Sequence, residues 1–456
     1  MEELIMKKIA VIGCTHAGTY VVKEILKEHK DVQVKVFERN QEISFLSCGI
    51  ALYLGGQVTD PAGLFYSNPQ ELRSLGAEIF AQHDVIAINS KDHTLRVKNL
   101  QTEEVWEEDY DKLVMTTGSW PIVPPIKGIK NDKVLLCKDW SHAQELFERA
   151  PKADRIAVIG AGYIGVELAE AYRLKGHAVT LIDEKERVMP KYFDEAFTTK
   201  IEKTFTEKGI DLALGQRVME FKDEKGEILV KTDQTEIPVD LAILCIGFRP
   251  NTSLLTGQID MLPNGAIITN EYMQSSNPDI LAAGDSVAVH FNPTEKPAYI
   301  PLATNAIRQG ILVGKNLFAP RVRSIGTQAT SGLVLFGISL CSTGLTAAAA
   351  KEQGIEAAQV ILEDNYRPEF MPTTEKVLMS LVYDPKSLKI LGGAFLSRQD
   401  ISQAANLLSL CIQNKNTIDD LAMVDMLFQP HFDKPFNYLN LLGQAAQKHQ
   451  TDQVLQ

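Results

Sequence analysis

The sequence contains no apolar run that approaches the roughly 18 residues of a membrane-spanning helix, because polar residues interrupt every candidate. The apolar stretch after Lys7 and Lys8 soon reaches Gly13 and lacks a small-residue cleavage site, which indicates a β-strand rather than a signal peptide. The net charge is −12 and the acidic residues are scattered, which argues against nucleic acid or an anionic membrane as a partner. We therefore expect a cytoplasmic protein that binds neither.

Cysteine is also sparse. The chain has 6 cysteines in 456 residues, widely spaced, with no CxxC pair and no spacing typical of a metal site. This pattern predicts a protein that stays reduced, holds no metal, and uses any functional cysteine singly.

Two segments share one plan and define the expected fold. KKIAVIGCTHAG passes from a strand through a glycine turn into a helix expected from Thr19 to Glu28, and RIAVIGAGYIGVELAEAYRLKG repeats this order. Each is followed by a further strand that ends in an acidic residue. Because 456 residues exceed one ordinary core, we predict an α/β protein with two Rossmann-like nucleotide-binding domains, each with a largely parallel sheet.

Gly/Pro-rich segments indicate where the domains begin and end. One follows the strand in YDKLVMTTG and another follows DLAILCIG, so we expect one domain over 1–120 and 250–325 and a second over 121–249. The remainder, 326–456, carries strands such as VLMSLVYD and ILGGAFL and a helix expected near 400–415, without a nucleotide motif. It is predicted to be an α+β domain used for association.

The second glycine turn has the full dinucleotide fingerprint. Gly160 permits the tight turn, Gly162 lets the backbone approach a pyrophosphate, and Gly165 lets helix and strand pack closely. Asp183 ends the next strand, where it can accept hydrogen bonds from a ribose 2′-hydroxyl and repel a 2′-phosphate. These features favour NADH over NADPH as the ligand; the alternative is a glycine turn that only packs.

The first turn is a weaker copy, because Thr15 stands where the middle glycine is usual. Glu38 supplies the acid at the end of the following strand. If one domain binds NADH, the other needs a second dinucleotide, and FAD is the natural choice. A later Gly-Asp turn places Asp285 where it could accept hydrogen bonds from the flavin's ribityl or phosphate region.

Cys48 and His16 are ambiguous from the residues alone. Cys48 lies in the apolar stretch ISFLSCGIALYLGG, and a lone cysteine there is more often an inert buried thiol than a reactive one. His16 lies in the first phosphate turn, where a lone histidine usually satisfies a local backbone group. Both alternatives stay open at this point.

Several ordered segments together resemble one family. They are GCTHAGT, ISFLSCGIALYLGG, VIGAGYIGVELAEAY, CIGFRPN, AAGDS and LFQPHFDKPFNYLN. In this combination, which spans essentially the whole chain, the sequence resembles the NADH oxidase / NADH peroxidase branch of the pyridine-nucleotide disulfide reductases.

The resemblance implies a set of site residues. Cys48 and His16 match the redox cysteine and the active-site histidine of that branch, and Tyr163 matches an aromatic residue that covers the flavin. Together with the residues above, the FAD-binding set is Gly13, Thr15, Ala17, Gly18, Glu38, Arg39, Thr117, Gly118, Asp285, Leu302, Ala303 and Thr304. The NAD-binding set is Gly160, Gly162, Tyr163, Ile164, Gly165, Glu167, Asp183, Tyr192 and Gly247.

The same resemblance implies an activity. FAD takes hydride from NADH and reduces dioxygen to water, with Cys48 cycling between thiolate and sulfenic acid, and His16 stabilises the thiolate or moves protons. No second cysteine stands four or five residues from Cys48, so a dithiol mechanism is disfavoured. The alternatives are an NADH peroxidase, a coenzyme A disulfide reductase, and a redox sensor or NADH-binding scaffold.

The C-terminal tail is interpreted as part of a homodimer, or of a dimer of dimers. His431 is similar to a histidine that relatives contribute across the dimer, but a catalytic role is not expected for it. The aromatic residues Phe428, Phe432, Phe436 and Tyr438 are expected to pack the interface.

Overall fold

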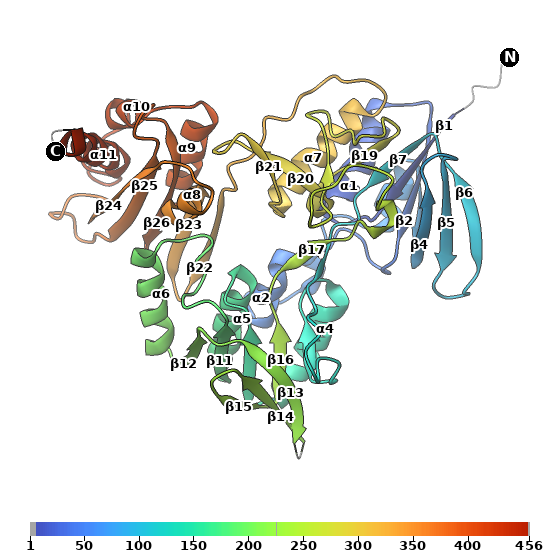
Figure 1. The fold of residues 1–456 in the computed structure, drawn as a ribbon, viewed down its shortest axis with the longest axis horizontal. Helices are drawn as coiled ribbons and strands as arrows, with labels where there is room; N and C mark the ends of the chain where they lie inside the picture. Colours follow the sequence, from blue (N-terminus) through green and yellow to red (C-terminus); the bar gives the residue numbers. More distant parts are fainter. Residues whose placement is uncertain (1–5, 225, 455–456) are drawn as a thin grey trace.

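The computed structural model describes residues 6–224 and 226–454. Two parallel sheets and one large antiparallel sheet organise the chain (Figure 1). Within the described residues, no helix is long and apolar enough to cross a membrane.

The N-terminal sheet has the order β19-β7-β1-β2-β3, with all neighbours parallel. Its strands are β1 (Lys7–Ile12), β2 (Val32–Glu38), β3 (Ala77–Ala81), β7 (Lys112–Met115) and β19 (Ile280–Ala282). Helices α1 (His16–Glu28) and α7 (Ala303–Asn316) pack against each other beside this sheet, with α3 (Pro69–Ser74) next to β3. Two small three-stranded sheets complete this part of the chain. One consists of β4 (His83–Asn89), β5 (Thr94–Asn99) and β6 (Val105–Asp109), and the other of β18 (Ile267–Ile268), β20 (Val287–Phe291) and β21 (Lys296–Ala298).

The second parallel sheet has the order β12-β11-β10-β16-β9. Its strands are β9 (Val134–Leu136), β10 (Arg155–Ile159), β11 (Ala178–Asp183), β12 (Ile210–Leu214) and β16 (Leu241–Leu244). Helices α2 (Ile50–Leu54), α4 (Trp140–Arg149), α5 (Tyr163–Leu174) and α6 (Glu195–Glu207) lie around it, and β13 (Val218–Glu224), β14 (Glu227–Thr232) and β15 (Glu236–Val239) form a side sheet. Both β1 and β10 carry the string Ile-Ala-Val-Ile, buried on both faces as expected for central parallel strands.

The chain crosses between these two sheets at a short strand pair. β8 (Ser119–Pro121) runs antiparallel to β17 (Phe248–Pro250), so the outward and return segments lie side by side. This pair is the boundary that we propose between the two nucleotide-binding domains.

The C-terminal sheet is antiparallel, in the order β22-β23-β26-β25-β24. Its strands are β22 (Ser331–Leu335), β23 (Ile338–Gly344), β24 (Ala358–Asn365), β25 (Lys376–Tyr383) and β26 (Ile390–Ser397). The helices here are α8 (Ala347–Glu352), α9 (Ser402–Gln413), α10 (Ile418–Met423) and α11 (Tyr438–Val454). The predicted fold class, two Rossmann-like domains followed by an α+β domain, is confirmed.

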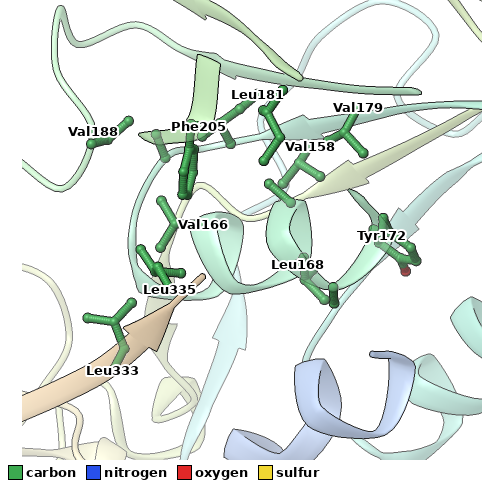
Figure 2. Close-up of a cluster of buried hydrophobic side chains, with 14 of the residues drawn as sticks. Val158, Val166, Leu168, Tyr172, Val179, Leu181, Val188, Phe205, Leu333 and Leu335 are labelled. Carbon is green, nitrogen blue, oxygen red and sulfur yellow. The ribbon is translucent and has the colours of Figure 1, made fainter. Parts of the chain in front are cut away.

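Successive side chains of β25 pack into two different hydrophobic cores, one on each face of the C-terminal sheet. Val377 and Met379 pack in the core formed with α9, α10 and α11, whereas Leu378 belongs to the core of the second parallel sheet. Leu333 and Leu335 of β22 lie in that same core, beside Val166 of α5 (Figure 2). The C-terminal domain therefore shares a continuous hydrophobic core with the domain that carries the second glycine turn.

The start of α1 differs from the prediction. The helix begins at His16, three residues before the expected Thr19, so Gly18 lies inside its first turn. Gly18 is needed there because a β-carbon would collide with the Gly13 carbonyl oxygen. The glycine allows close approach of helix and strand rather than marking a break.

Candidate active site

A cavity of about 2000 Å³ lies between the two glycine turns. Its wall includes Gly13 and His16 from the first turn and Gly160 and Gly162 from the second, and it also includes Cys48. Segments far apart in the sequence therefore meet at one space.

Both turns require glycine at their first position. Gly13 has φ +89°, and a β-carbon there would lie 2.5 Å from the Thr116 carbonyl oxygen. Gly160 has φ +107°, and its β-carbon would meet the backbone of Cys245. Gly162 differs, because a β-carbon added there would meet no atom within 4 Å, so its backbone is open to the cavity.

The two acidic residues occupy equivalent positions. Glu38 Oε2 accepts a hydrogen bond from the Cys14 backbone N–H at 2.7 Å, and Asp183 Oδ2 accepts one from the Ala161 N–H at 2.6 Å. In each case the donor directly follows the first glycine of the turn. Each acid therefore holds its turn in place and lies on the cavity wall.

Phosphate groups of a dinucleotide fit the helix ends that face this cavity. The first turns of α1 and α5 have no side-chain cap and no acidic residue, whereas α3 and α4 are capped by Asn68 and Asp139. Uncapped N–H groups at a helix start bind anions, helped by the helix dipole. The open backbone at Gly162 and the cavity volume of about 2000 Å³ fit this use, so the residues present suit FAD and NAD(H).

Asp285 is held by two polar neighbours that the sequence did not indicate. Its Oδ2 accepts hydrogen bonds from Ser119 Oγ at 2.7 Å and from Lys138 Nζ at 3.2 Å, and Lys138 also donates to Ser119 at 2.9 Å. The ammonium of Lys138 lies 4.5 Å from the Phe248 ring centroid. This cluster joins the crossover strands β8 and β17 to the predicted FAD-binding aspartate.

Cys48 lies in a short 3₁₀ turn, Ser47–Gly49, and its side chain is exposed on the cavity wall. Protein atoms still surround the thiol on most sides, and this burial raises its pKa, with a further contribution from the Glu167 carboxylate. Lys138 opposes both effects. All six cysteines lie in the described part of the chain, and all are free.

His16 is the first residue of α1, and its ring contacts Tyr66, which is not part of the cavity wall. The Tyr66 hydroxyl lies 2.6 Å from His16 Nδ1, and the two rings stack with centroids 5.7 Å apart. Burial lowers the pKa of His16, an effect that Asp285 opposes and Lys138 reinforces. The ring is therefore neutral near pH 7, which favours proton movement over stabilisation of a thiolate by an imidazolium.

The part of the cavity wall that holds the predicted NAD-binding residues Tyr163, Glu167 and Tyr192 is formed by α5 and the loop after β11. The Tyr163 hydroxyl lies 2.9 Å from Ser331 Oγ of β22, and its ring packs edge-on against Tyr192 with centroids 4.5 Å apart. Glu167 follows one turn later on α5, and burial, with a smaller contribution from Glu170, raises its pKa to about 7.

Most residues of the two predicted sets line the cavity. Those on its wall are Cys48, His16, Gly13, Thr15, Ala17, Glu38, Arg39, Thr117, Gly118, Asp285, Leu302, Ala303, Gly160, Gly162, Tyr163, Ile164, Glu167, Asp183, Tyr192 and Gly247. Gly18 and Gly165 instead pack against the carbonyls of Gly13 and Gly160, and Thr304 lies in the first turn of α7. Tyr66, Ser119 and Lys138 gave no sequence signal, because each contacts residues at least 19 positions away.

The C-terminal tail lies outside this cavity. His431 is exposed, and its Nδ1 contacts the Gln429 side chain. Phe428, Phe432 and Phe436 are about half exposed or more, whereas Tyr438, the first residue of α11, packs partly into the core.

Comparison with known proteins accounts for this arrangement. Residues 7–310 match the protein family described as pyridine nucleotide-disulphide oxidoreductase, and residues 330–438 match the dimerisation domain of that family. The chain belongs to the pyridine nucleotide-disulphide oxidoreductase family. Its relatives include an NADH oxidase of Enterococcus faecalis, 56% identical over 96% of this chain and 99% of that protein.

Solved structures agree with this assignment. The water-forming NADH oxidase of Lactobacillus brevis, bound to NADH, is 64% identical with a TM-score of 0.98 over 98% of this chain and 100% of that one. An engineered water-forming NADPH oxidase, a variant of that enzyme bound to NADPH, is 63% identical with a TM-score of 0.97 over the same shares. These comparisons confirm the predicted family. They also confirm the predicted class of enzyme, a flavoprotein NADH oxidase, and the predicted cofactors, FAD and NAD(H).

Proposed function

We propose that the protein reduces dioxygen to water with NADH, and that Cys48 cycles between thiolate and sulfenic acid. The observation that carries this proposal is the placement of Cys48 on the wall of the cavity that joins both dinucleotide-binding turns, where it is the exposed one of three lining cysteines; Cys137 is buried and Cys245 is partly buried. The similarity to the water-forming enzyme of Lactobacillus brevis supports it.

The chain's own residues hold the two cofactors. The first turn with Glu38, the α1 N-terminus and Asp285 would hold FAD; the second turn with Asp183, the α5 N-terminus and Tyr163 would hold NADH. When bound, FAD supplies hydride acceptance from NADH and electron transfer to dioxygen. Asp183 would accept hydrogen bonds from the ribose hydroxyls of NADH, and its charge would disfavour the 2′-phosphate of NADPH.

Cys48 carries out the second half of the reaction. Its thiolate attacks one oxygen of hydrogen peroxide, the O–O bond breaks, and the departing hydroxide takes a proton to become water. The electrons of a second NADH and two protons return the sulfenic acid to the thiol and release a second water. Overall, one dioxygen and two NADH give two waters.

Replacing Cys48 with serine tests this scheme. The variant should still oxidise NADH in air but release hydrogen peroxide, because no thiolate remains to cleave it. Oxygen uptake and peroxide should be measured together, per NADH consumed. Cys411→Ser is the matched control, because Cys411 lies in α9 outside the cavity, and it should release as little peroxide as the unaltered protein.

The same assay separates the alternatives. Peroxide released one-for-one with NADH by the unaltered protein would overturn the water-forming proposal. NADH oxidation that needs added peroxide would indicate an NADH peroxidase, and oxidation that needs coenzyme A disulfide would indicate a disulfide reductase. A Cys48→Ser protein that still forms only water would remove Cys48 from the mechanism.

A further inference from the structure

Tyr66 lies directly behind His16 and is not part of the cavity wall. Its segment is fixed to the segment that precedes Cys48: the Leu46 N–H donates to the Leu64 carbonyl at 2.8 Å, and the Ser67 N–H donates to Ser44 Oγ at 2.9 Å. The backbone that places Tyr66 is thus bonded to the backbone that places Cys48. The phenol and the thiol are held in one rigid arrangement.

The direction of the Tyr66–His16 hydrogen bond follows from what each group can do. Among the described residues, His16 Nδ1 is the partner found for the Tyr66 hydroxyl. Burial raises the pKa of this hydroxyl, with smaller contributions from Tyr20 and the nearby thiols, so in the resting protein it carries a proton that it can donate. A half-buried O–H without an acceptor is unfavourable, so the phenol donates and Nδ1 accepts.

This direction determines the state of the imidazole. If Nδ1 accepts, a neutral ring must carry its proton on Nε2. Among the described residues, Nε2 is a buried side-chain nitrogen without a protein partner. An unpaired buried N–H on a residue that lines the cavity is ready to donate to a small molecule bound there.

We propose that Tyr66 is a positioning residue that fixes His16 as the Nε2–H tautomer and resupplies its proton through Nδ1 when Cys48 cleaves peroxide. This inference rests on the proposed function. In the step, the Cys48 thiolate forms an S–O bond and the peroxide O–O bond breaks. The Nε2 proton goes to the departing hydroxide as Nδ1 takes the Tyr66 proton. The products are the sulfenic acid, one water, a tyrosinate and the Nδ1–H form of His16. The Nδ1 proton then returns to the tyrosinate while Nε2 takes a proton from solvent, which restores the resting pair.

The tautomer is measured directly by NMR on holoenzyme labelled with ¹⁵N-histidine. Two-bond ¹H–¹⁵N correlations distinguish the Nε2–H tautomer, the Nδ1–H tautomer and the imidazolium, and the spectrum of His16→Asn assigns the ring signals. We expect the Nε2–H form in the unaltered protein at pH 7. The Nδ1–H form or an imidazolium there overturns the inference without any variant of Tyr66.

Tyr66→Phe removes the hydroxyl and keeps the ring that stacks on His16. We expect its His16 signals to show both neutral tautomers. We also expect anaerobic NADH oxidation with added hydrogen peroxide to slow by about tenfold, because proton delivery to the leaving oxygen is impaired. Tyr20→Phe is the matched control, since the Tyr20 ring lies 6.1 Å from that of Tyr66 but has no bond to His16. Its tautomer and peroxide rate should match those of the unaltered protein.

The outcomes separate the two proposals. An unchanged tautomer in Tyr66→Phe overturns the role of Tyr66, whatever Cys48 does. An unchanged peroxide rate with a changed tautomer overturns the proton resupply. If Cys48→Ser still forms only water, the proposed function falls, whereas the NMR result still reports whether Tyr66 sets the tautomer.

Discussion

Glu167 and Glu170 lie one helical turn apart on α5 and serve different neighbours. Glu170 accepts a hydrogen bond from the Phe336 backbone N–H, in the turn between β22 and β23 of the C-terminal domain. Glu167 lines the cavity, and the negative charge of its carboxylate contributes to the raised pKa values of the Cys48 and Cys137 thiols. Burial is the main cause of the raised pKa of Glu167, and repulsion between the two carboxylates adds to it.

The shift at Glu167 predicts a pH dependence of stability. Its ordinary pKa of 4.5 is raised to about 7, so the folded protein binds more protons than the unfolded chain between these values. Stability from this group therefore falls as pH rises from 4.5 to 7 and stays low above it. Glu167→Gln removes the charge, so its advantage over the unaltered protein should grow from about 1 kcal/mol at pH 5 to at most about 3 kcal/mol at pH 8.

Thermal unfolding at the two pH values measures this difference. Glu148→Gln on the exposed face of α4 is the control, and its melting temperature should follow that of the unaltered protein at both pH values. An equal effect of Glu167→Gln at pH 5 and pH 8 would contradict the raised pKa.

At the scale of elements, the strand–turn–helix–strand units around Gly13 and Gly160 share one construction. The acid that ends the second strand of each unit accepts a hydrogen bond from the N–H after the first glycine, so Glu38 and Asp183 both stabilise a turn and line the cavity. Asp183 Oδ1 also accepts from the Lys185 N–H at 2.7 Å. A substitution at Asp183 must therefore be judged for its effects on both the turn and the ligand.

Asp183→Asn keeps an oxygen that can accept from Ala161 and removes the negative charge. We expect the ratio of kcat/KM for NADPH to that for NADH to rise by about tenfold, because repulsion of the 2′-phosphate is lost. Steady-state kinetics with both nucleotides measures the ratio. Glu186→Gln, a nearby exposed acid off the cavity wall, should leave the ratio unchanged. The same ratio in Asp183→Asn and the unaltered protein would remove Asp183 from the choice of nucleotide.

These units explain which parts of the fold and site are predictable from sequence. The glycines, the buried strands and the acids recur at short spacing, so local patterns indicate both domains and the glycine turns and acids of the cavity wall. Cys48 and His16 are ambiguous from the residues alone, and only the resemblance to the family indicates them. The Tyr66–His16 contact spans 50 residues and the Ser119–Asp285 contact spans 166, and both depend on how strands and loops assemble. Local sequence contains no information of that kind. The early start of α1 was likewise concealed by Gly18, whose role appears only once the Gly13 carbonyl is in place.

At the scale of the whole molecule, the C-terminal domain packs through β22 against α5 and exposes apolar side chains elsewhere on its surface. Leu333 and Leu335 are buried against α5, whereas the segment between α10 and α11 exposes several large apolar side chains. Leu427 is 68% exposed and Phe432 is 66% exposed, with Phe428 and Phe436 close by in sequence. Exposed apolar groups gathered in this way are typical of a protein interface. This segment lies within residues 330–438, which match the family's dimerisation domain.

We therefore expect this aromatic segment to hold two copies of the chain together. Phe432→Glu places a charge where the partner surface would exclude water, and it should weaken the dimer by at least about tenfold. Sedimentation velocity over a range of protein concentrations measures the change. Leu174→Glu is the matched control, because Leu174 is 58% exposed at the end of α5, outside the C-terminal domain, and should leave association unaltered. If Phe432→Glu dimerises at the same concentration as the unaltered protein, the interface lies on another face of the molecule.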